Sequence, residues 1–159
     1  AYDQFRQGKT APPYLVLAGG KGWLDSGIYK KVEELGLGDL VKFTEYVPDE
    51  EICPLMCGAL AFVFPSIYEG FGLPPLEAMA CGVPVLTTHA ASLPEVVGED
   101  AVVADPYSPE SIAAGLEQLY TDEALRQKLR EAGPKRAAQF TWERSAEQLY
   151  AVYQEACRE

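Results

Sequence analysis

The sequence predicts a single α/β domain with a doubly wound, Rossmann-like parallel sheet covered by helices on both faces. Three features support this prediction: short strand segments alternate with helical segments, most of the strand segments are apolar without polar alternation, and glycine or proline stands at many of their boundaries. Apolar strands separated by helices are typical of parallel sheets that are buried on both faces. A length of 159 residues, with 48% hydrophobic residues, suits one such domain with its own core.

The first half of the chain supplies the first alternations. Residues Tyr14–Ala18 (YLVLA) form an aliphatic run that stops at Gly19-Gly20, as a buried strand does. The apolar spacing over Leu24–Leu35 predicts a helix that Gly36 ends. The elements expected next are a strand near 41–43, a short helix opened by Asp49 and an apolar strand over 59–64.

The second half continues this alternation. Its first expected elements are a helix over 74–80, a strand over 83–87 and an edge strand at 102–103. Ser108-Pro109 combines an N-cap residue with proline at the first helical position, which predicts a helix through Tyr120. The next helix is expected to start near Asp122 and to end where Gly133-Pro134 interrupts it.

The last expected helix starts near Thr141 and gathers apolar side chains on one face. Trp142, Leu149, Tyr150 and Tyr153 form this stripe. We expect half of the stripe to pack on the domain. The rest should favour self-association, which the net charge of -11 resists only in part.

Charge and composition exclude several classes of partner. The net charge of -11 repels polyanions, so neither nucleic acid nor an anionic membrane surface is an expected partner. The longest apolar runs, around 59–64 and 83–86, are far shorter than the roughly 20 residues that cross a bilayer, so no transmembrane segment is expected. The first residues, AYDQFRQGKT, lack the pattern of a signal peptide, which makes the cytoplasm the expected location.

The chain has four cysteines, Cys53, Cys57, Cys81 and Cys157, and a single histidine, His89. Cys53 and Cys57 can share one face of a helix at positions i and i+4, but two ligands do not make a zinc site. The sequence therefore predicts buried thiols and no metal.

Ligands of doubly wound sheets bind beyond the carboxyl ends of the strands. The loops at these ends are 19–23, 44–48, 65–73 and 88–93. The third loop is the richest, because Gly70 and Gly72 flank Phe71 just before a helix with proline in its first turn. Glycines let the backbone approach a ligand, and the amides of a helix start attract anions. This loop is a candidate cradle for a diphosphate.

Two carboxylates, Glu69 and Glu77, bracket the cradle. A carboxylate accepts hydrogen bonds from hydroxyl groups, which sugars offer in pairs. Glu77 could therefore hold a ribose while Glu69 faces a sugar beyond the phosphates. The spacing alone leaves open that Glu77 is a solvated helix residue and Glu69 a loop charge.

These residues carry a resemblance to a known family. The stretch PSIYEGFGLPPLEAMACGVPVLTT, followed by SLPEVVG and DPYSPESIAAGLEQL, resembles the C-terminal domain of the group 1 (family 4) glycosyltransferases. The resemblance runs from YLVLAGGKGW to the terminal FTWERSAEQLYAVY segment. It implies the GT-B architecture of two facing Rossmann-like domains. It also implies retaining transfer of a sugar from a nucleotide-diphosphate donor to an acceptor hydroxyl, with no cofactor and no required metal.

The resemblance also implies roles for individual residues. Glu69 is the expected catalytic residue at the donor sugar, Glu77 would hold the ribose, and the base would meet the backbone near Val47. His89 matches no recognised catalytic histidine and is expected to be a surface or packing residue, and a solvated Lys21 is as compatible with the sequence as one that binds phosphate. The donor-binding residues implied in this way are Gly19, Gly20, Lys21, Val47, Ser66, Gly70, Phe71, Gly72, Leu73 and Glu77.

The start of the chain departs from the family pattern. Family members begin this domain with a strand and a glycine-rich turn whose arginine and lysine hold the donor phosphates, whereas AYDQFRQ corresponds to the tail of the first helix. Phe5 and Arg6 cannot replace that pair on spacing. The expectation is that residues 1–159 are the donor-binding domain of a longer protein, inactive without its N-terminal, acceptor-binding domain.

Three other interpretations stay open at this point. A non-catalytic nucleotide-binding module that acts with a partner chain would have the same loops. A GT-B epimerase or phosphorylase would share the sheet but not the EGFGLPPLE run. A flavodoxin-like signalling domain would need an acidic cluster after the first strand, which this sequence lacks. The base, the sugar and the acceptor are not fixed by the sequence.

Overall fold

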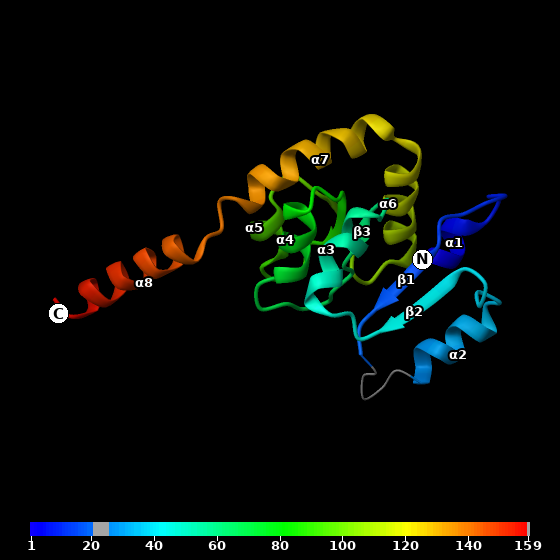
Figure 1. Cartoon of the computed structure of the whole chain (residues 1–159), viewed down its shortest axis with the longest axis horizontal. Helices are drawn as coiled ribbons and strands as arrows, with labels where there is room; N and C mark the ends of the chain where they lie inside the picture. Colours follow the sequence, from blue (N-terminus) through cyan, green and yellow to red (C-terminus); the bar gives the residue numbers. More distant parts are fainter. Residues whose placement is uncertain (21–25, 159) are drawn as a thin grey trace.

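The computed structural model describes residues 1–20 and 26–158 (Figure 1). The strands are β1 (Leu15–Ala18), β2 (Val41–Glu45), β3 (Phe62–Val63), β4 (Val85–Thr88) and β5 (Val102–Ala104). The helices are α1 (Tyr2–Arg6), α2 (Ser26–Glu34), α3 (Asp49–Cys57), α4 (Leu73–Ala80), α5 (Leu93–Val97), α6 (Pro109–Thr121), α7 (Glu123–Ala137) and α8 (Trp142–Ala156). Every strand pair among the described residues is parallel, which confirms the expected α/β class.

The strands form two parallel ladders, β1-β2 and β3-β4-β5, where one sheet was expected. A doubly wound sheet usually has the strand order 3-2-1-4-5-6. The observed ladders match the two flanks of that order, with β2-β1 as one flank and β3-β4-β5 as the other. Among the described residues, no strand occupies the central position between β1 and β3, so the inner edges of both strands are unpaired.

The core lies on both faces of β4, all of whose residues are buried. Val85 belongs to a cluster with Ala78 and Met79 of α4 and with residues of α5. Leu86, the next residue, belongs to a second cluster with Leu119 of α6 and residues of β5 and α7. Neighbouring strand residues point to opposite faces, so helices cover the larger ladder on both sides.

The β1-β2 ladder is attached to this body through α1, which packs on α6. Phe5 is buried and meets the ring of Tyr120 edge to face, with centroids 5.6 Å apart. Lys9 lies over the Phe5 ring and forms an ion pair with Glu117. The Arg6 guanidinium donates to the carbonyl of Leu35 at 3.2 Å, which links α1 to the end of α2. Helix α3, which follows β2, also packs on the body through α4.

Helix α7 does not end at Gly133-Pro134, so that expectation was wrong. It continues to Ala137 with Pro134 inside it. Gly133 is buried against α4, where an added Cβ would lie 3.0 Å from the Met79 carbonyl oxygen. Close packing of α7 on α4 therefore stabilises the helix past the missing amide of proline. Helix α5 was not expected at all, because five residues are too few for a periodic pattern.

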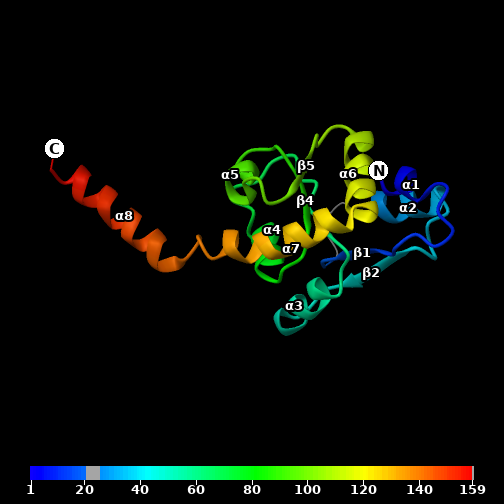
Figure 2. The same ribbon diagram turned by 90° about the horizontal axis from the view of Figure 1, so that it is seen from above.

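Helix α8 extends away from the body in both Figure 1 and Figure 2. None of its residues is buried, and Trp142 and Tyr150 are 83% and 64% exposed. The expectation that half of the stripe packs on the domain was therefore wrong. Residues 138–141 lead the chain away from α7, and Thr141 caps a new helix by accepting a hydrogen bond from the Arg144 amide at 3.1 Å. No described helix is long and apolar enough to cross a membrane. The cytoplasmic location stays a prediction.

Candidate functional site

Two buried threonines at the end of β4 form hydrogen bonds to the loop after β3. Thr87 Oγ1 donates to the carbonyl of Phe64 at 3.1 Å, and Thr88 Oγ1 donates to the carbonyl of Ser66 at 2.6 Å. Buried hydroxyl groups are costly without a partner, so these bonds fix the first residues of the loop to the core. Neither threonine was among the predicted site residues.

Ser66 and Glu69 come together within this loop. The Ser66 hydroxyl lies 3.2 Å from Glu69 Oε2 and 3.0 Å from the carbonyl oxygen of Tyr68. Glu69 is half-buried, whereas Tyr68 is exposed. A hydroxyl has one proton but can divide it between two acceptors, so Ser66 orients the Glu69 carboxylate and the turn that carries it. The structure thus joins the predicted catalytic residue to a predicted donor-binding residue.

Ser92 forms hydrogen bonds to the other end of the same loop. Its hydroxyl lies 2.9 Å from the carbonyl oxygen of Phe71 and 3.3 Å from that of Glu69. Leu93, its neighbour, is fully buried against Gly72. Sequence reasoning gave no role to these two residues, although the SLPEVVG segment that contains them was part of the family resemblance.

Gly72 is required at its position for two reasons. It has a φ of 105°, in the left-handed region that side chains disfavour, and it caps the start of α4. A Cβ there would lie 2.7 Å from Cδ2 of Leu93. Gly70 differs, because its backbone is ordinary and an added Cβ would meet open space.

The candidate anion cradle offers fewer backbone amides than the sequence indicated. Pro74 and Pro75 stand in the first turn of α4, and proline has no amide hydrogen to offer. In the part of the chain that the structure describes, the amides of Gly70, Phe71 and Gly72 donate to no protein acceptor. The loop amides, more than the helix start itself, are therefore available to an anion. Glu77 follows on α4, exposed and with no side-chain partner among the described residues.

The remaining predicted residues form a second group at the ends of β1 and β2. A register shift between Leu17 and Ala18 lets the Gly19 amide donate to the Glu45 carbonyl at 3.0 Å, so Gly19-Gly20 lies beside the turn that leads to half-buried Val47. Lys21 lies outside the described residues. Among the described residues, no hydrogen bond or ion pair joins this group to the Gly70–Gly72 loop.

Leu73 and His89 are both exposed at the edges of the predicted site. Leu73, the first residue of α4, has a half-exposed side chain beside the cradle. His89 is exposed directly after β4, as expected for a surface residue.

The segment between α7 and α8 touches the loop from another side. The ring of Phe140 meets Phe71 edge to face at 5.9 Å, and the Arg136 guanidinium lies 5.1 Å from the centre of the Phe140 ring. Arg136 also donates to the carbonyl of Val96 at 2.9 Å. A surface hollow of about 320 Å³ lies here, lined in part by Arg136, Phe140 and Arg144. The contact joins residues almost seventy positions apart and leaves no local pattern in the sequence.

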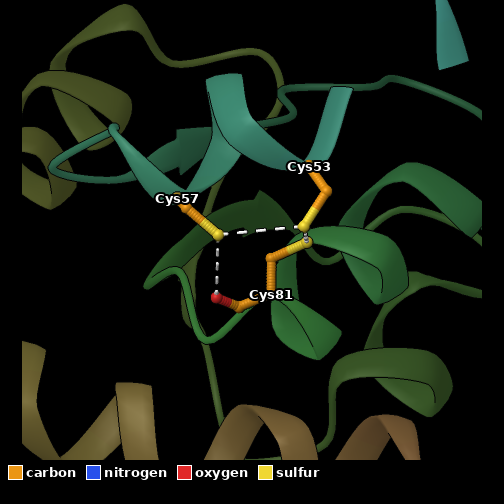
Figure 3. A group of neighbouring side chains, drawn as sticks. All are labelled: Cys53, Cys57 and Cys81. Carbon is orange, nitrogen blue, oxygen red and sulfur yellow. Dashed lines mark hydrogen bonds between the residues drawn. The ribbon is translucent and has the colours of Figure 1, made fainter. Parts of the chain in front are cut away.

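The cysteines are not buried, so that expectation was wrong. Cys53, Cys57 and Cys157 are exposed and Cys81 is half-buried. Three of the four lie together between α3 and the end of α4, with their sulfur atoms facing one another (Figure 3). Burial, followed by the neighbouring Cys53 thiol, raises the pKa of Cys81 to about 12. The pKa of Cys57 is also raised, chiefly by its hydrogen bond with Cys53.

Comparison with known proteins decides the family. The family described as glycosyl transferases group 1 matches residues 1–136, which is most of the sequence and includes the whole candidate site. This chain belongs to the group 1 glycosyl transferases. Alpha8 lies outside the matched region.

Curated relatives of this chain include two named mannosyltransferases. The O-antigen chain mannosyltransferase B of Escherichia coli is 42% identical over 139 residues, covering 87% of this chain and 36% of the relative. The MMP alpha-(1->4)-mannosyltransferase of Mycolicibacterium hassiacum is 38% identical, covering 80% of this chain and 32% of the relative. The chain spans about a third of the length of these curated relatives.

Solved structures share the fold. A sucrose-phosphate synthase from Thermosynechococcus elongatus superposes with a TM-score of 0.84 at 28% identity, over 99% of this chain and 41% of that one. Anabaena HepE in complex with UDP and glucose has a TM-score of 0.79 at 22% identity, over 98% and 43% of the two chains. The C-terminal domain of the group 1 glycosyl transferase LpcC from Francisella tularensis has a TM-score of 0.68 at 24% identity and is covered over 92% of its length. The fold is thus that of a GT-B C-terminal domain.

Proposed function

We propose that residues 1–159 form the donor-binding domain of a retaining glycosyltransferase, which transfers a sugar from a nucleotide-diphosphate sugar to an acceptor hydroxyl. The observation that carries this proposal is the Ser66–Gly72 loop, which combines an oriented carboxylate with amides that have no acceptor among the described residues. The named mannosyltransferases and the UDP complex of HepE support the same class of donor. Mannose is therefore the first sugar to test.

Each group of the site has a part in this proposal. The amides of Gly70, Phe71 and Gly72 bind the diphosphate and stabilise the negative charge that grows on it as it leaves. Glu69, held by Ser66, faces the donor sugar, where positive charge develops on the ring. Glu77 accepts hydrogen bonds from the ribose. Glu69 is not assigned as a covalent nucleophile, because the leaving phosphate can itself take the acceptor proton.

The group at the ends of β1 and β2 supplies the other wall of the donor site. The Val47 turn meets the base, and Gly19, Gly20 and Lys21 form the rim beside it. Ser66 and Leu73 complete the donor-binding set. No metal is part of this site in the proposal. The one cluster of potential metal ligands found among the described residues lies between the second half of α3 and the end of α4.

The acceptor is proposed to bind in a separate N-terminal domain that faces this one. Support comes from the length of the curated relatives, of which this chain spans about a third. The central strand position between β1 and β3 is unfilled among the described residues, which suits a strand supplied by further sequence. Such a strand would bring the two groups of donor-binding residues to one continuous sheet edge.

Titration followed by amide chemical shifts tests the donor site directly. Uridine and guanosine diphosphates, and then their mannose conjugates, are added to the isotope-labelled chain. We expect weak binding that moves the signals of Gly70, Phe71, Gly72 and Glu77 together. Perturbation confined to residues 120–139 would contradict the proposal.

A matched pair of variants tests the role of Glu77. Glu77→Gln should lower the affinity for a nucleoside diphosphate about tenfold, because a charged acceptor to the ribose is lost. Glu99→Gln removes an exposed carboxylate elsewhere on the surface and should leave the affinity unchanged.

The chain alone should transfer no sugar to any acceptor. Sugar transfer by this chain at the rate of an intact relative would mean that the whole active site lies within residues 1–159, and would contradict the two-domain proposal.

A further inference from the structure

Three cysteine thiols converge at a place that the proposed function does not use. Cys53 and Cys57 stand one turn apart on α3, and Cys81 caps the end of α4. Their sulfur atoms all lie within 4.8 Å of one another (Figure 3). The Cys53 and Cys57 sulfurs are 3.8 Å apart, and those of Cys81 and Cys53 are 3.1 Å apart.

These separations are close to those of thiolates that share one metal ion. A tetrahedral ion with metal–sulfur bonds of about 2.3 Å holds its sulfur ligands about 3.8 Å apart. The Cys53–Cys57 pair already has this spacing. The Cys81–Cys53 pair must open by about 0.7 Å, which a rotation of the exposed Cys53 side chain can supply.

We propose that Cys53, Cys57 and Cys81 bind one soft, thiophilic cation of the Zn²⁺ class, with its fourth position open to solvent. Thiolates are the ligands that such ions prefer. The first turn of α3 carries Asp49, Glu50 and Glu51, and the chain has a net charge of -11, so the surroundings attract cations. The ion displaces the thiol protons on binding and releases them to solvent.

The geometry favours a cation over the other uses of clustered cysteines. A disulfide between Cys53 and Cys81 would leave Cys57 unused and would need an external oxidant. A cation uses all three sulfurs at once.

The bound ion would join a loosely held helix to a firmly held one. No residue of α3 is buried, whereas Ala78 and Met79 of α4 are fully buried. Alpha3 begins just after the Val47 turn, and α4 begins just after the Gly70–Gly72 loop. At 1.5 Å per residue, Cys57 and Cys81 stand roughly 12 Å from the starts of their helices, and Cys53 stands roughly 6 Å from the start of α3. The ion therefore fixes the angle between two helices that start at the donor loops without touching the donor.

The test uses the reduced, metal-free chain and a matched cysteine control. We expect one Zn²⁺ per chain by titration calorimetry, proton release at neutral pH, and a thiolate-to-metal absorption band when Co²⁺ or Cd²⁺ replaces Zn²⁺. Cys53→Ser and Cys57→Ser should each weaken Zn²⁺ binding by more than about 100-fold, since loss of a ligand costs more than loss of an outer partner. Cys157→Ser removes the exposed cysteine on α8 and should bind as the unaltered chain does.

Several results would overturn the proposal. One is unchanged Zn²⁺ affinity in the Cys53→Ser, Cys57→Ser double variant, and another is no binding by the reduced chain. A third is a Cys53–Cys81 disulfide that reforms in the presence of excess Zn²⁺. Circular dichroism checks that the variants fold, which the exposure of Cys53 and Cys57 favours. Nucleoside diphosphate binding is measured in a separate titration. A failure of Zn²⁺ binding is therefore distinguishable from a failure of the donor site.

Discussion

The two strand ladders differ in how firmly they hold their share of the candidate site. The β3-β4-β5 ladder has a fully buried central strand, whose Thr88 hydroxyl donates to Ser66, and Ser92, just beyond that strand, donates to Phe71, so both ends of the Ser66–Gly72 loop are held. The β1-β2 ladder alternates between half-buried and exposed residues along β1 and is attached through α1. The phosphate side of the site is therefore built into a core, whereas the base side is held by two helix contacts, α1 on α6 and α3 on α4.

The largest expected effect is that of adding a side chain at Gly72, in the loop that follows strand β3. Gly72→Ala must adopt a left-handed φ and push its Cβ against buried Leu93, so it should lower the free energy of unfolding by about 3 kcal/mol. Gly70→Ala meets open space and should change it by less than about 0.5 kcal/mol. Urea unfolding of the two variants measures both values. Equal effects would mean that the loop is not clamped as described.

A smaller change should loosen the N-terminal ladder alone. Phe5→Leu keeps a buried apolar side chain but loses the edge-to-face contact with Tyr120, at a cost of about 1 kcal/mol. Hydrogen exchange should quicken in β1 and β2 while that of β4 stays slow. Tyr107→Leu, at an exposed ring, is the control and should alter neither ladder. Uniformly faster exchange in both ladders would show that they unfold as one unit.

Much of this architecture could be predicted from local sequence. Ser108, Asp122 and Thr141 each cap a helix with a side-chain oxygen, and all three helix starts were located from the sequence. Most of the strands were found because they are apolar runs beside turn residues, although β2 contains Lys42 and Glu45. The Gly70–Gly72 loop was found because glycine spacing before a helix is itself a local signal.

The features that escaped prediction depend on contacts between distant segments. Continuation of α7 past Pro134 depends on its packing against Met79, more than fifty residues earlier. The cysteine cluster needs Cys81 to meet Cys53 across two helices. The exposure of α8 reflects the absence of a packing partner among the described residues, which an amphipathic pattern cannot reveal.

Removal of the Ser92 hydroxyl should loosen the Ser66–Gly72 loop without unfolding it. Ser92→Ala loses the hydrogen bond to Phe71 and the longer one to Glu69, so stability should fall by about 1 kcal/mol. Nucleoside diphosphate affinity should fall with it, because the loop amides are no longer held in one arrangement. Ser145→Ala removes an exposed hydroxyl on α8 as the control. A variant with normal stability and normal affinity would contradict the role given to Ser92.

The smallest expected effect concerns α8, which belongs to neither ladder. Its exposed face carries Trp142, Leu149, Tyr150 and Tyr153, and this much apolar surface favours association of one chain with another. The net charge of -11 opposes close approach, so the association should be weak and should strengthen when salt screens the charge. Sedimentation over a wide concentration range, at low and high salt, measures the mean mass. Tyr150→Lys should restore the monomer, whereas Glu147→Lys, at another exposed position of α8, should leave the association in place. A monomer mass that stays constant at the highest concentration would mean that the stripe is covered by something other than a second copy.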